Sequence, residues 1–366
     1  MFVYNSSQLL KERGSADHFE TTNGFYDDTL ASMYSAEYFL VEWIKRSGFV
    51  VTDPEEANLF LVPQYGVLIT EMCRRQGFGL FDCSSNVTKR YISVLIDAVS
   101  SKEWYKRNDG ADHMWIFTWD HGCDLYPGMC GRIENCIHII QEPTNLHRPL
   151  MKRPLVIPAP VQSTWNWKRT QEIALLRDCE RSRLTGPTCR VLKRPNLIFF
   201  AGTVHADRGY SRGVRQDLKK IFEEKQRSDV VFLDHAVPDY EEQAASSTFC
   251  LCPPGWAPWS PRLYAAMAAS CIPVMYPMEN YFMALPFNKT IPWNSLMVMI
   301  PPGQISRTYE ILSEVSEQKR LEMRIAAAQY VPMILIAQYP ERSTSLVLKE
   351  ALQWSKVKVS QKRLAE

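Results

Sequence analysis

Several features that would assign this chain to a common class of protein are absent. It has no run of 18 or more apolar residues, the length that a membrane-spanning helix needs. Its 42 basic and 40 acidic residues leave a net charge of +2, so the basic face of a nucleic-acid-binding protein is not expected. No GxGxxG follows the first apolar stretch, which argues against a nicotinamide-dependent oxidoreductase. No DxD-type pair follows a predicted strand, which argues against a metal-dependent nucleotidyl enzyme.

The ten cysteines also lack the CxxC spacing of a zinc site. Seven of them lie in groups around loop-like sequence, as local disulfides do: Cys73 and Cys83; Cys123, Cys130 and Cys136; Cys179 and Cys189. We expect the other three, Cys250, Cys252 and Cys271, to be buried free thiols. Because Cys250 and Cys252 are two residues apart, they share one face of a strand.

Three N-glycosylation motifs begin at Asn5, Asn86 and Asn288, and with the cysteines they favour a secretory lumen. No signal peptide precedes the strand expected at residues 2–4. We therefore expect that a membrane anchor upstream is missing from this sequence.

What the sequence does have is an alternation of strands and helices in both halves. With 366 residues and 46% hydrophobic content, the chain can form two cores. Strands are expected at 2–4, 50–51, 59–62, 114–117, 137–140, 155–157, 196–200, 230–233 and 296–300, with two more at the start and at the end of the segment 247–274. Helices are expected at 29–46, 89–100, 211–224, 239–246, 261–269, 305–317 and 318–329.

This alternation predicts an α/β protein with two Rossmann-like parallel-sheet domains facing a central cleft. The predicted boundaries are an N-terminal domain over 1–160, a linker over 161–194, a C-terminal domain over 195–335 and a C-terminal helix or tail over 336–366.

The most informative segment is 247–274, which reads as strand, rigid loop, helix and strand. Ser260 is a candidate N-cap and Pro261 a candidate first helical residue. A helix N-terminus attracts anions, and Arg262 adds a forked cation beside it. Gly255 would let the backbone approach a bound group closely. The segment therefore predicts a diphosphate site without a glycine-rich fingerprint.

Motifs in order along residues 2–330 resemble the exostosin-like glycosyltransferases of family 47. They are Tyr38-Phe39 to Trp43, Thr52 to Tyr65, Gly110 to His113, Thr118 to Gly122, Phe199 to Gly202, Tyr210 to Arg215, Phe249 to Val274, Leu285 to Phe287 and Trp293.

The resemblance implies a GT-B fold and an inverting transfer of a sugar from a UDP-sugar donor to a glycan or polysaccharide. It implies that the donor is bound by the C-terminal domain and the acceptor mainly by the N-terminal domain. It also implies a Golgi enzyme that works without a catalytic metal and without a cofactor, since the nucleotide sugar is a substrate. A partner glycosyltransferase is compatible with it, whereas a nucleic-acid partner and a membrane span within this chain are not expected.

For donor binding we expect Arg262, Ser260, Gly255 and Gly202, with Arg212 and Arg215 three residues apart on one face of the next helix. His205 is a weaker candidate in the same loop. Solvent-exposed arginines in a first helical turn are an equally good interpretation of Arg212 and Arg215.

The catalytic base of an inverting transfer takes the proton of the acceptor hydroxyl. Asp120 and His121 follow the strand at 114–117, and Glu142 follows the strand at 137–140. The sequence leaves these three candidates open, and an aspartate in an ordinary turn is an alternative interpretation of Asp120.

The chain departs from the family pattern at Ala265, where members commonly have an acid that would bind the donor ribose. Glu279 could compensate for its loss. Ser270 replaces the glycine that commonly ends this helix, and Trp119 stands where many members have histidine. The alternative function is therefore a catalytically weak or inactive paralogue that binds a glycan or a partner protein.

Overall fold

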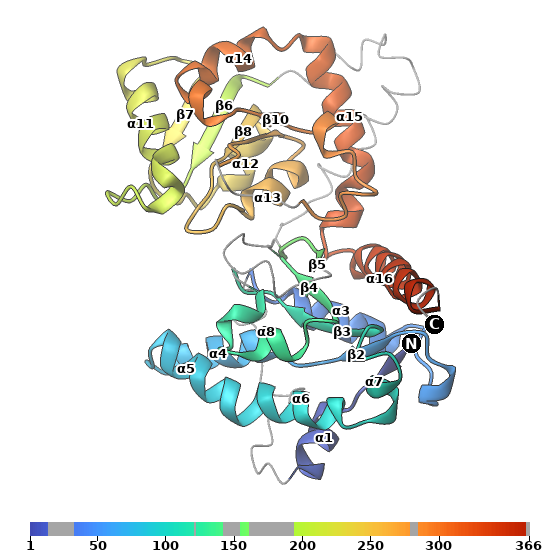
Figure 1. Ribbon diagram of the computed structural model, residues 1–366. Coiled ribbons are helices and arrows are strands. Elements are labelled where there is room, and N and C mark those ends of the chain that lie inside the picture. Colours follow the sequence, from blue (N-terminus) through green and yellow to red (C-terminus); the bar gives the residue numbers. More distant parts are fainter. Residues whose placement is uncertain (14–32, 121, 142–153, 161–193, 279–284, 364–366) are drawn as a thin grey trace. The chain divides into compact units, whose positions relative to one another are not determined.

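The computed structural model describes the chain except residues 14–32, 121, 142–153, 161–193, 279–284 and 364–366 (Figure 1). The chain divides into two compact units. Unit 1 comprises Met1–Pro160, Ala284–Phe287 and Ile336–Glu366, and unit 2 comprises Val161–Met283 and Asn288–Leu335. Among the described residues, no helix is both long and apolar enough to cross a membrane. The predicted linker lies almost wholly outside the described residues, as do Cys179 and Cys189.

Unit 1 is built on a five-stranded parallel sheet with the order β1-β2-β3-β4-β5. Its strands are β1 (Phe2–Val3), β2 (Phe60–Val62), β3 (His113–Phe117), β4 (Ile137–Ile140) and β5 (Pro154–Val156). Its helices include α1 (Ser6–Glu12), α3 (Ala36–Arg46), α4 (Gly66–Arg75), α5 (Leu80–Val87), α6 (Ser93–Ser100), α7 (Glu103–Arg107), α8 (Met129–Arg132) and α16 (Pro340–Arg363).

The central strands β3 and β4 are buried at every position, as expected for parallel strands covered on both faces. Helix α16 packs against α3 and β5, although it lies far from both in the sequence. The C-terminal segment is therefore part of the core of unit 1.

Unit 2 is built on a second parallel sheet, with the order β10-β9-β8-β6-β7. Its strands are β6 (Asn196–Ala201), β7 (Val230–Leu233), β8 (Ser247–Cys252), β9 (Ile272–Met275) and β10 (Val298–Met299). Its helices include α11 (Val214–Glu224), α12 (Tyr240–Ala245), α13 (Arg262–Ala268), α14 (Thr308–Glu314) and α15 (Glu317–Ile334). Two Rossmann-like parallel-sheet units confirm the predicted α/β fold class.

The main core of unit 2 covers one face of this sheet. Its strand residues alternate along each strand, which is why they share a face: Ile198, Phe200, Phe249, Leu251, Ile272 and Val274. Val214, Leu218 and Phe222 of α11 supply the helical side of this core at a spacing of four residues.

Several expected elements differ from the structure, among them the helix expected at 29–46, which within the described residues begins only at Ala36. Residues 50–51 form no strand, and the last strand of unit 2 is the two-residue β10 instead of 296–300. The helix expected at 211–224 begins only at Val214, because Ser211, Arg212 and Gly213 have positive φ angles of 59°, 51° and 81°. A run of left-handed residues cannot belong to a right-handed helix.

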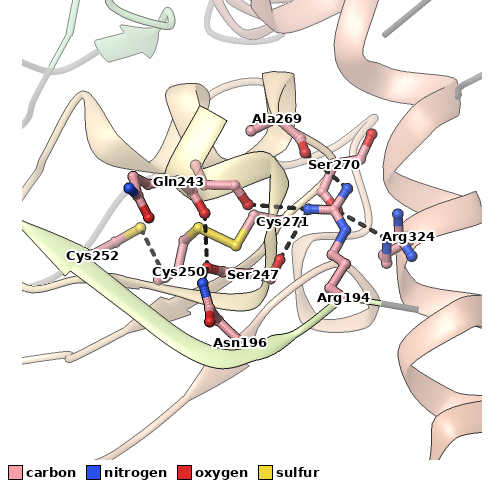
Figure 2. The surroundings of a disulfide bond; sticks show 11 residues. Arg194, Asn196, Gln243, Ser247, Cys250, Cys252, Ala269, Ser270, Cys271 and Arg324 are labelled. Atoms are coloured by element: carbon pink, nitrogen blue, oxygen red, sulfur yellow. Dashed lines mark hydrogen bonds between the residues drawn. A yellow bond between two sulfur atoms is a disulfide. The ribbon is translucent and has the colours of Figure 1, made fainter. Parts of the chain in front are cut away.

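The expectation that Cys250, Cys252 and Cys271 are all free thiols is wrong for two of them. Cys250 and Cys271 form a disulfide with Cα atoms 5.8 Å apart, whereas Cys252 is a buried thiol (Figure 2). Cys271 directly precedes β9, which pairs with β8 in parallel. The 21-residue separation is thus one strand–helix–strand crossover, which places the two cysteines side by side in space.

Local disulfides are expected in the cysteine groups of the loop-like sequence, and two are present in unit 1: Cys73–Cys83 and, within the group of three whose pairing the sequence leaves open, Cys123–Cys130. Cys136, the third member of its group, is a buried thiol.

Two arginines fix the C-terminal end of α13 beside the disulfide (Figure 2). Arg194 donates to the carbonyl oxygens of Ala244, Ser247 and Ala269 at 2.9–3.1 Å. Arg324 donates from Nε to the carbonyl oxygen of Ser270 at 2.9 Å. The carbonyls of Ala244, Ala269 and Ser270 lie at helix ends, where carbonyl groups lack partners within the helix, and that of Ser247 lies at the start of β8. The position of α13, and of Arg262 at its other end, is thereby fixed.

Candidate functional site

The strand order of unit 2 reverses between β6 and β8. The chain runs from β6 outward to β7, then returns past β6 to form β8 on its other side. Ligands of open parallel sheets bind at the carboxyl ends of the strands at such a switch point. Two of the predicted arginines meet there, Arg215 from the first turn of α11 and Arg262 from the start of α13.

Arg215 is 2% exposed and binds the loops that follow both strands. Its guanidinium donates to the carbonyl oxygens of Thr203, Pro253 and Pro254 at 2.8, 3.3 and 2.9 Å. It also donates to the hydroxyl of Tyr210 at 2.6 Å. Burial, and then the neighbouring charge of Arg262, lower the pKa of Arg215 to about 10. Arg215 therefore holds together the two loops that form the site.

Arg262 is half-buried and lies closer to solvent. Its Nε donates to the carbonyl oxygen of Ala201 at 3.2 Å, and its guanidinium lies 5.4 Å from the ring centre of Phe200. The guanidinium of Arg215 lies 5.7 Å from the centre of the same ring. A β-carbon at Gly202 would collide with Nη2 of Arg262. Gly202 thus makes room for the arginine, and its direct contact with the donor stays a prediction.

The two guanidinium groups form a pair of like charges in a partly desolvated place. Within the described parts of the chain, neither Arg215 nor Arg262 donates to a carboxylate, and their hydrogen-bond partners are carbonyl and hydroxyl oxygens. Two desolvated positive charges repel each other unless an anion lies between or beside them. The arrangement is therefore suited to a ligand with several negative charges.

Ser260 is buried beside this pair, and its hydroxyl accepts from the backbone N–H of Arg262 at 3.3 Å. The predicted N-cap is one residue too early, because α13 begins at Arg262 with Pro261 at the N-cap position, and Ser260 binds the first N–H of the helix instead. Nη1 of Arg262 lies within 3.5 Å of the same hydroxyl, so Ser260 also orients the guanidinium. Direct contact of this hydroxyl with a phosphate stays a prediction.

The prediction that Arg212 and Arg215 share one helix face is wrong. Arg212 is exposed and left-handed, and it lies before the first residue of α11. Gly255 lies in the loop after β8, and its carbonyl oxygen accepts from the N–H of Ser211 at 2.8 Å. A β-carbon at Gly255 would have ordinary contacts of 3.8–3.9 Å, so neighbouring protein atoms alone do not require glycine there.

An aromatic cluster borders the arginine pair. The Tyr210 ring lies 4.4 Å from that of His205 and 5.1 Å from that of Trp256, both edge to face. The guanidinium of Arg215 lies 4.7 Å from the centre of the Tyr210 ring. Sequence reasoning did not identify Phe200 and Tyr210 as site residues, although both lie within the quoted motifs.

Asp120, one of the three candidates for the base, lies in unit 1 just beyond the carboxyl end of β3. It is half-buried, and its Oδ1 accepts from the hydroxyl of Tyr34 at 3.2 Å. The centres of the Tyr34 and Trp119 rings lie 4.7 Å apart, so Trp119 supports this contact. Gln141, directly after β4, is buried, and its side-chain oxygen has no hydrogen-bond partner among the described residues.

Of the other candidate site residues, only some lie in the described part of the chain. His121, Glu142 and Glu279 lie outside the described residues. Ala265 lies in the first turn of α13 and is partly exposed. Within the described ranges, the one cluster of potential metal ligands is Cys123, Asp124 and Cys130, and its two cysteines are joined in a disulfide.

Comparison of the sequence with known proteins identifies one family and several related enzymes. The family model described as "Exostosin GT47 domain" matches residues 1–315. A "Probable glucuronosyltransferase" of Oryza sativa subsp. japonica is 27% identical over 329 residues, which are 86% of this chain and 71% of that protein. "Probable glucuronosyltransferase 47 A" of Physcomitrium patens is 28% identical over 309 residues, 80% of this chain and 62% of that protein.

A third relative is a "Probable glucuronoxylan glucuronosyltransferase" of Arabidopsis thaliana, 25% identical over 308 residues, 79% of this chain and 60% of that protein. The chain thus spans less than two thirds of two of these three relatives. Among solved structures, a glycosyltransferase from Rickettsia africae has a TM-score of 0.42 and 11% identity, covering 89% of this chain and 94% of that one.

Proposed function

Because this chain belongs to the exostosin GT47 family of glycosyltransferases, we propose that it transfers a sugar from a UDP-sugar donor to a glycan acceptor with inversion. The observation that carries the proposal is the pair Arg215 and Arg262 at the β6/β8 switch point. Among the described residues, neither guanidinium group has a carboxylate partner. A nucleoside diphosphate is an anion of the right kind for such a pair. Glucuronic acid is the first donor sugar to test, since the plant relatives carry the name glucuronosyltransferase.

In the proposed reaction, the acceptor hydroxyl oxygen bonds to the anomeric carbon as the bond from that carbon to the UDP oxygen breaks. The hydroxyl proton passes to a base, for which we propose Asp120, with His121 and Glu142 as the other candidates. The charge that develops on the diphosphate is stabilised by Arg262, oriented by Ser260, and by Arg215. We propose that these two arginines stabilise the leaving diphosphate without a metal ion and that no cofactor takes part.

The first test is thermal stabilisation of the purified chain by UDP and by UDP-sugars. A ligand at about a hundred times its dissociation constant adds about 2.7 kcal/mol to the free energy of unfolding. Arg262→Ala should abolish that gain, and Ser260→Ala should reduce it. Arg208→Ala is the matched control, because Arg208 is an exposed arginine of the neighbouring loop whose guanidinium pairs with Asp217 at 2.9 Å. Equal stabilisation of Arg262→Ala and Arg208→Ala by UDP would refute this donor site.

Catalysis is tested separately by UDP release in the presence of EDTA. Asp120→Asn should lower kcat by about a hundredfold or more while UDP binding is retained, as expected for loss of a general base. Loss of activity in EDTA that is restored by a divalent cation would refute the metal-independent reaction.

A second function has one observation in its favour. Ala265 leaves the first turn of α13 without the acid that family members commonly have there. A charged hydrogen bond contributes about 1.5–3 kcal/mol, so its absence weakens donor binding. If no nucleotide stabilises the chain but Ala265→Asp restores UDP binding, we would assign it as a non-catalytic paralogue that binds a glycan or a partner glycosyltransferase. For either function we propose residence in the Golgi lumen, which glycan analysis at Asn5, Asn86 and Asn288 would test.

A further inference from the structure

The loop between β8 and α13 exposes a tryptophan that the proposed transfer reaction does not use. Trp256 is 63% exposed, the highest fraction for a large hydrophobic side chain in the described part of unit 2. A single apolar side chain on a surface needs no explanation. Trp256, however, packs on Tyr210 in the aromatic cluster beside the arginine pair, so its exposed ring belongs to a built site.

Hydrogen bonds from two loops hold this cluster in place. In the loop after β8, the carbonyl oxygen of Gly255, next to Trp256, accepts from the N–H of Ser211 at 2.8 Å. In the loop after β6, Nε2 of Gln216 donates to the carbonyl oxygens of His205 and Asp207 at 2.6 and 2.9 Å. The two loops are thus ordered before any ligand binds, and a ligand loses little binding free energy in ordering them.

The cluster offers two kinds of contact side by side. Tyr210 packs edge to face against both His205 and Trp256, whose own ring centres lie 6.0 Å apart. The side chains of Thr203, His205 and Asp207 are exposed in the loop that leads to Tyr210. A hydrogen-bonding ring, that of His205, therefore lies beside an exposed apolar one.

This combination is suited to a sugar residue within a chain. One face of a pyranose ring presents C–H groups, which the negative face of an aromatic ring attracts, and its hydroxyl groups need hydrogen-bonding partners at the rim. Sites for small molecules bury most of the ligand, whereas most of the Trp256 side chain faces solvent. An open ring of this kind can contact one residue of a polymer that continues beyond it.

The size of the exposed ring argues against a protein partner. A tryptophan contributes about 150–250 Å², whereas each side of a stable protein interface buries about 800 Å².

We propose that Trp256 stacks on a sugar residue of the acceptor glycan, with Tyr210 supporting the indole ring and His205 binding hydroxyl groups. The cluster is continuous with the arginine pair, because Arg215 donates to the hydroxyl of Tyr210 at 2.6 Å. The inference rests on the proposed function for the statement that this glycan is the acceptor. Glycan binding itself can be measured without a nucleotide.

The test is affinity electrophoresis of the full chain in native gels that contain arabinoxylan, hydroxyethylcellulose or galactomannan. These polysaccharides are uncharged, so retardation does not reflect the charge of the protein. At least one of them should retard the original chain. Trp256→Ala should bind that polysaccharide at least about tenfold more weakly, because the stacking contact is lost, and Trp256→Phe should keep most of the binding. Phe81→Ala is the matched control, since Phe81 is 84% exposed outside the cluster, and it should be retarded like the original chain.

UDP separates this inference from the proposed donor site. Trp256→Ala should be stabilised by UDP as much as the original chain, and circular dichroism checks that each variant is folded. Retardation that depends on Trp256 in a chain that does not respond to UDP would support the glycan site and refute the transferase.

The glycan site would be overturned if none of these polysaccharides retarded the original chain, or if Trp256→Ala were retarded equally. Loss of UDP stabilisation in Trp256→Ala would also overturn it, because the indole ring would then stack on the nucleobase.

Discussion

At the scale of single residues, Ser270 is held in a backbone conformation that suits glycine. Its φ angle is +53°, and it follows Ala269, the C-cap of α13. Its N–H donates to Met267, and that of Cys271 donates to Ala266, the pair of bonds that closes a helix with a left-handed residue. The left-handed conformation costs a residue with a β-carbon about 1–2 kcal/mol. Serine stands here where family members commonly have glycine, and the backbone at this position is strained as a result.

We therefore expect Ser270→Gly to raise the free energy of unfolding by about 1 kcal/mol, the relief of strain being partly offset by the greater freedom of glycine in the unfolded chain. Urea denaturation measures the change. Ser246→Gly is the control, because Ser246 follows α12 with φ at −89° and should lose stability on substitution. The explanation by strain fails if the two glycine variants are equally destabilised.

His138, in β4, makes unit 1 sensitive to acid. It is fully buried, and its Nε2 donates to the carbonyl oxygen of Ile133 at 3.0 Å, while Nδ1 has no described hydrogen-bond partner. Burial lowers the pKa of His138 from 6.5 to about 4. Because the folded pKa lies below the unfolded one, the stabilisation is complete above pH 6.5 and is lost as the pH falls to about 4.

The expected loss is about 3 kcal/mol over that interval. His138→Gln, which keeps a neutral donor, should flatten the decline when the free energy of unfolding is measured from pH 7 to pH 4. An unchanged pH dependence in this variant would show that other groups cause the acid sensitivity.

At the scale of elements, the Cys250–Cys271 disulfide joins β8, the strand that leads to the arginine pair, to the turn before β9. Closing a loop of 21 residues stabilises a fold by about 3 kcal/mol in the chain-entropy model. Replacing both cysteines by alanine should lower the free energy of unfolding by about that amount. Cys252→Ala on the same strand is the control, because it removes a buried sulfur without removing a cross-link. Equal losses in the two variants would show that packing of the sulfur atoms, and not the cross-link, is what stabilises unit 2.

Elements with strong local signals could be predicted from the sequence, and those set by distant partners could not. The strand Val230–Leu233 has the expected bounds, and β8, α13 and β9 follow in the expected order. The Cys250–Cys271 pairing depends on which strands are neighbours, which no local spacing reveals. Likewise, the motif identified Arg215, but its burial depends on carbonyl oxygens from a loop nearly forty residues away. Of the predicted base candidates, only Asp120 lies in the described chain.

At the scale of the whole molecule, each unit has its own sheet and core, and α16 belongs to unit 1 despite its position at the end of the sequence. Val347 of α16 and Val274 of β9 are both fully buried, the first in unit 1 and the second in the core of unit 2. Because each unit has its own core and domains generally unfold as units, calorimetry should show two transitions. Replacing either valine by alanine removes two methyl groups from a packed core, which costs about 2 kcal/mol.

Val347→Ala should lower only the transition of unit 1, and Val274→Ala only that of unit 2. UDP should raise the transition that Val274→Ala lowers, because the arginine pair lies in unit 2. Each valine substitution thus identifies a transition, and the nucleotide then reports which unit contains its site. A single transition lowered equally by both substitutions would mean that the two cores unfold together. A nucleotide response confined to the transition that Val347→Ala lowers would place the UDP site in unit 1, away from Arg215 and Arg262.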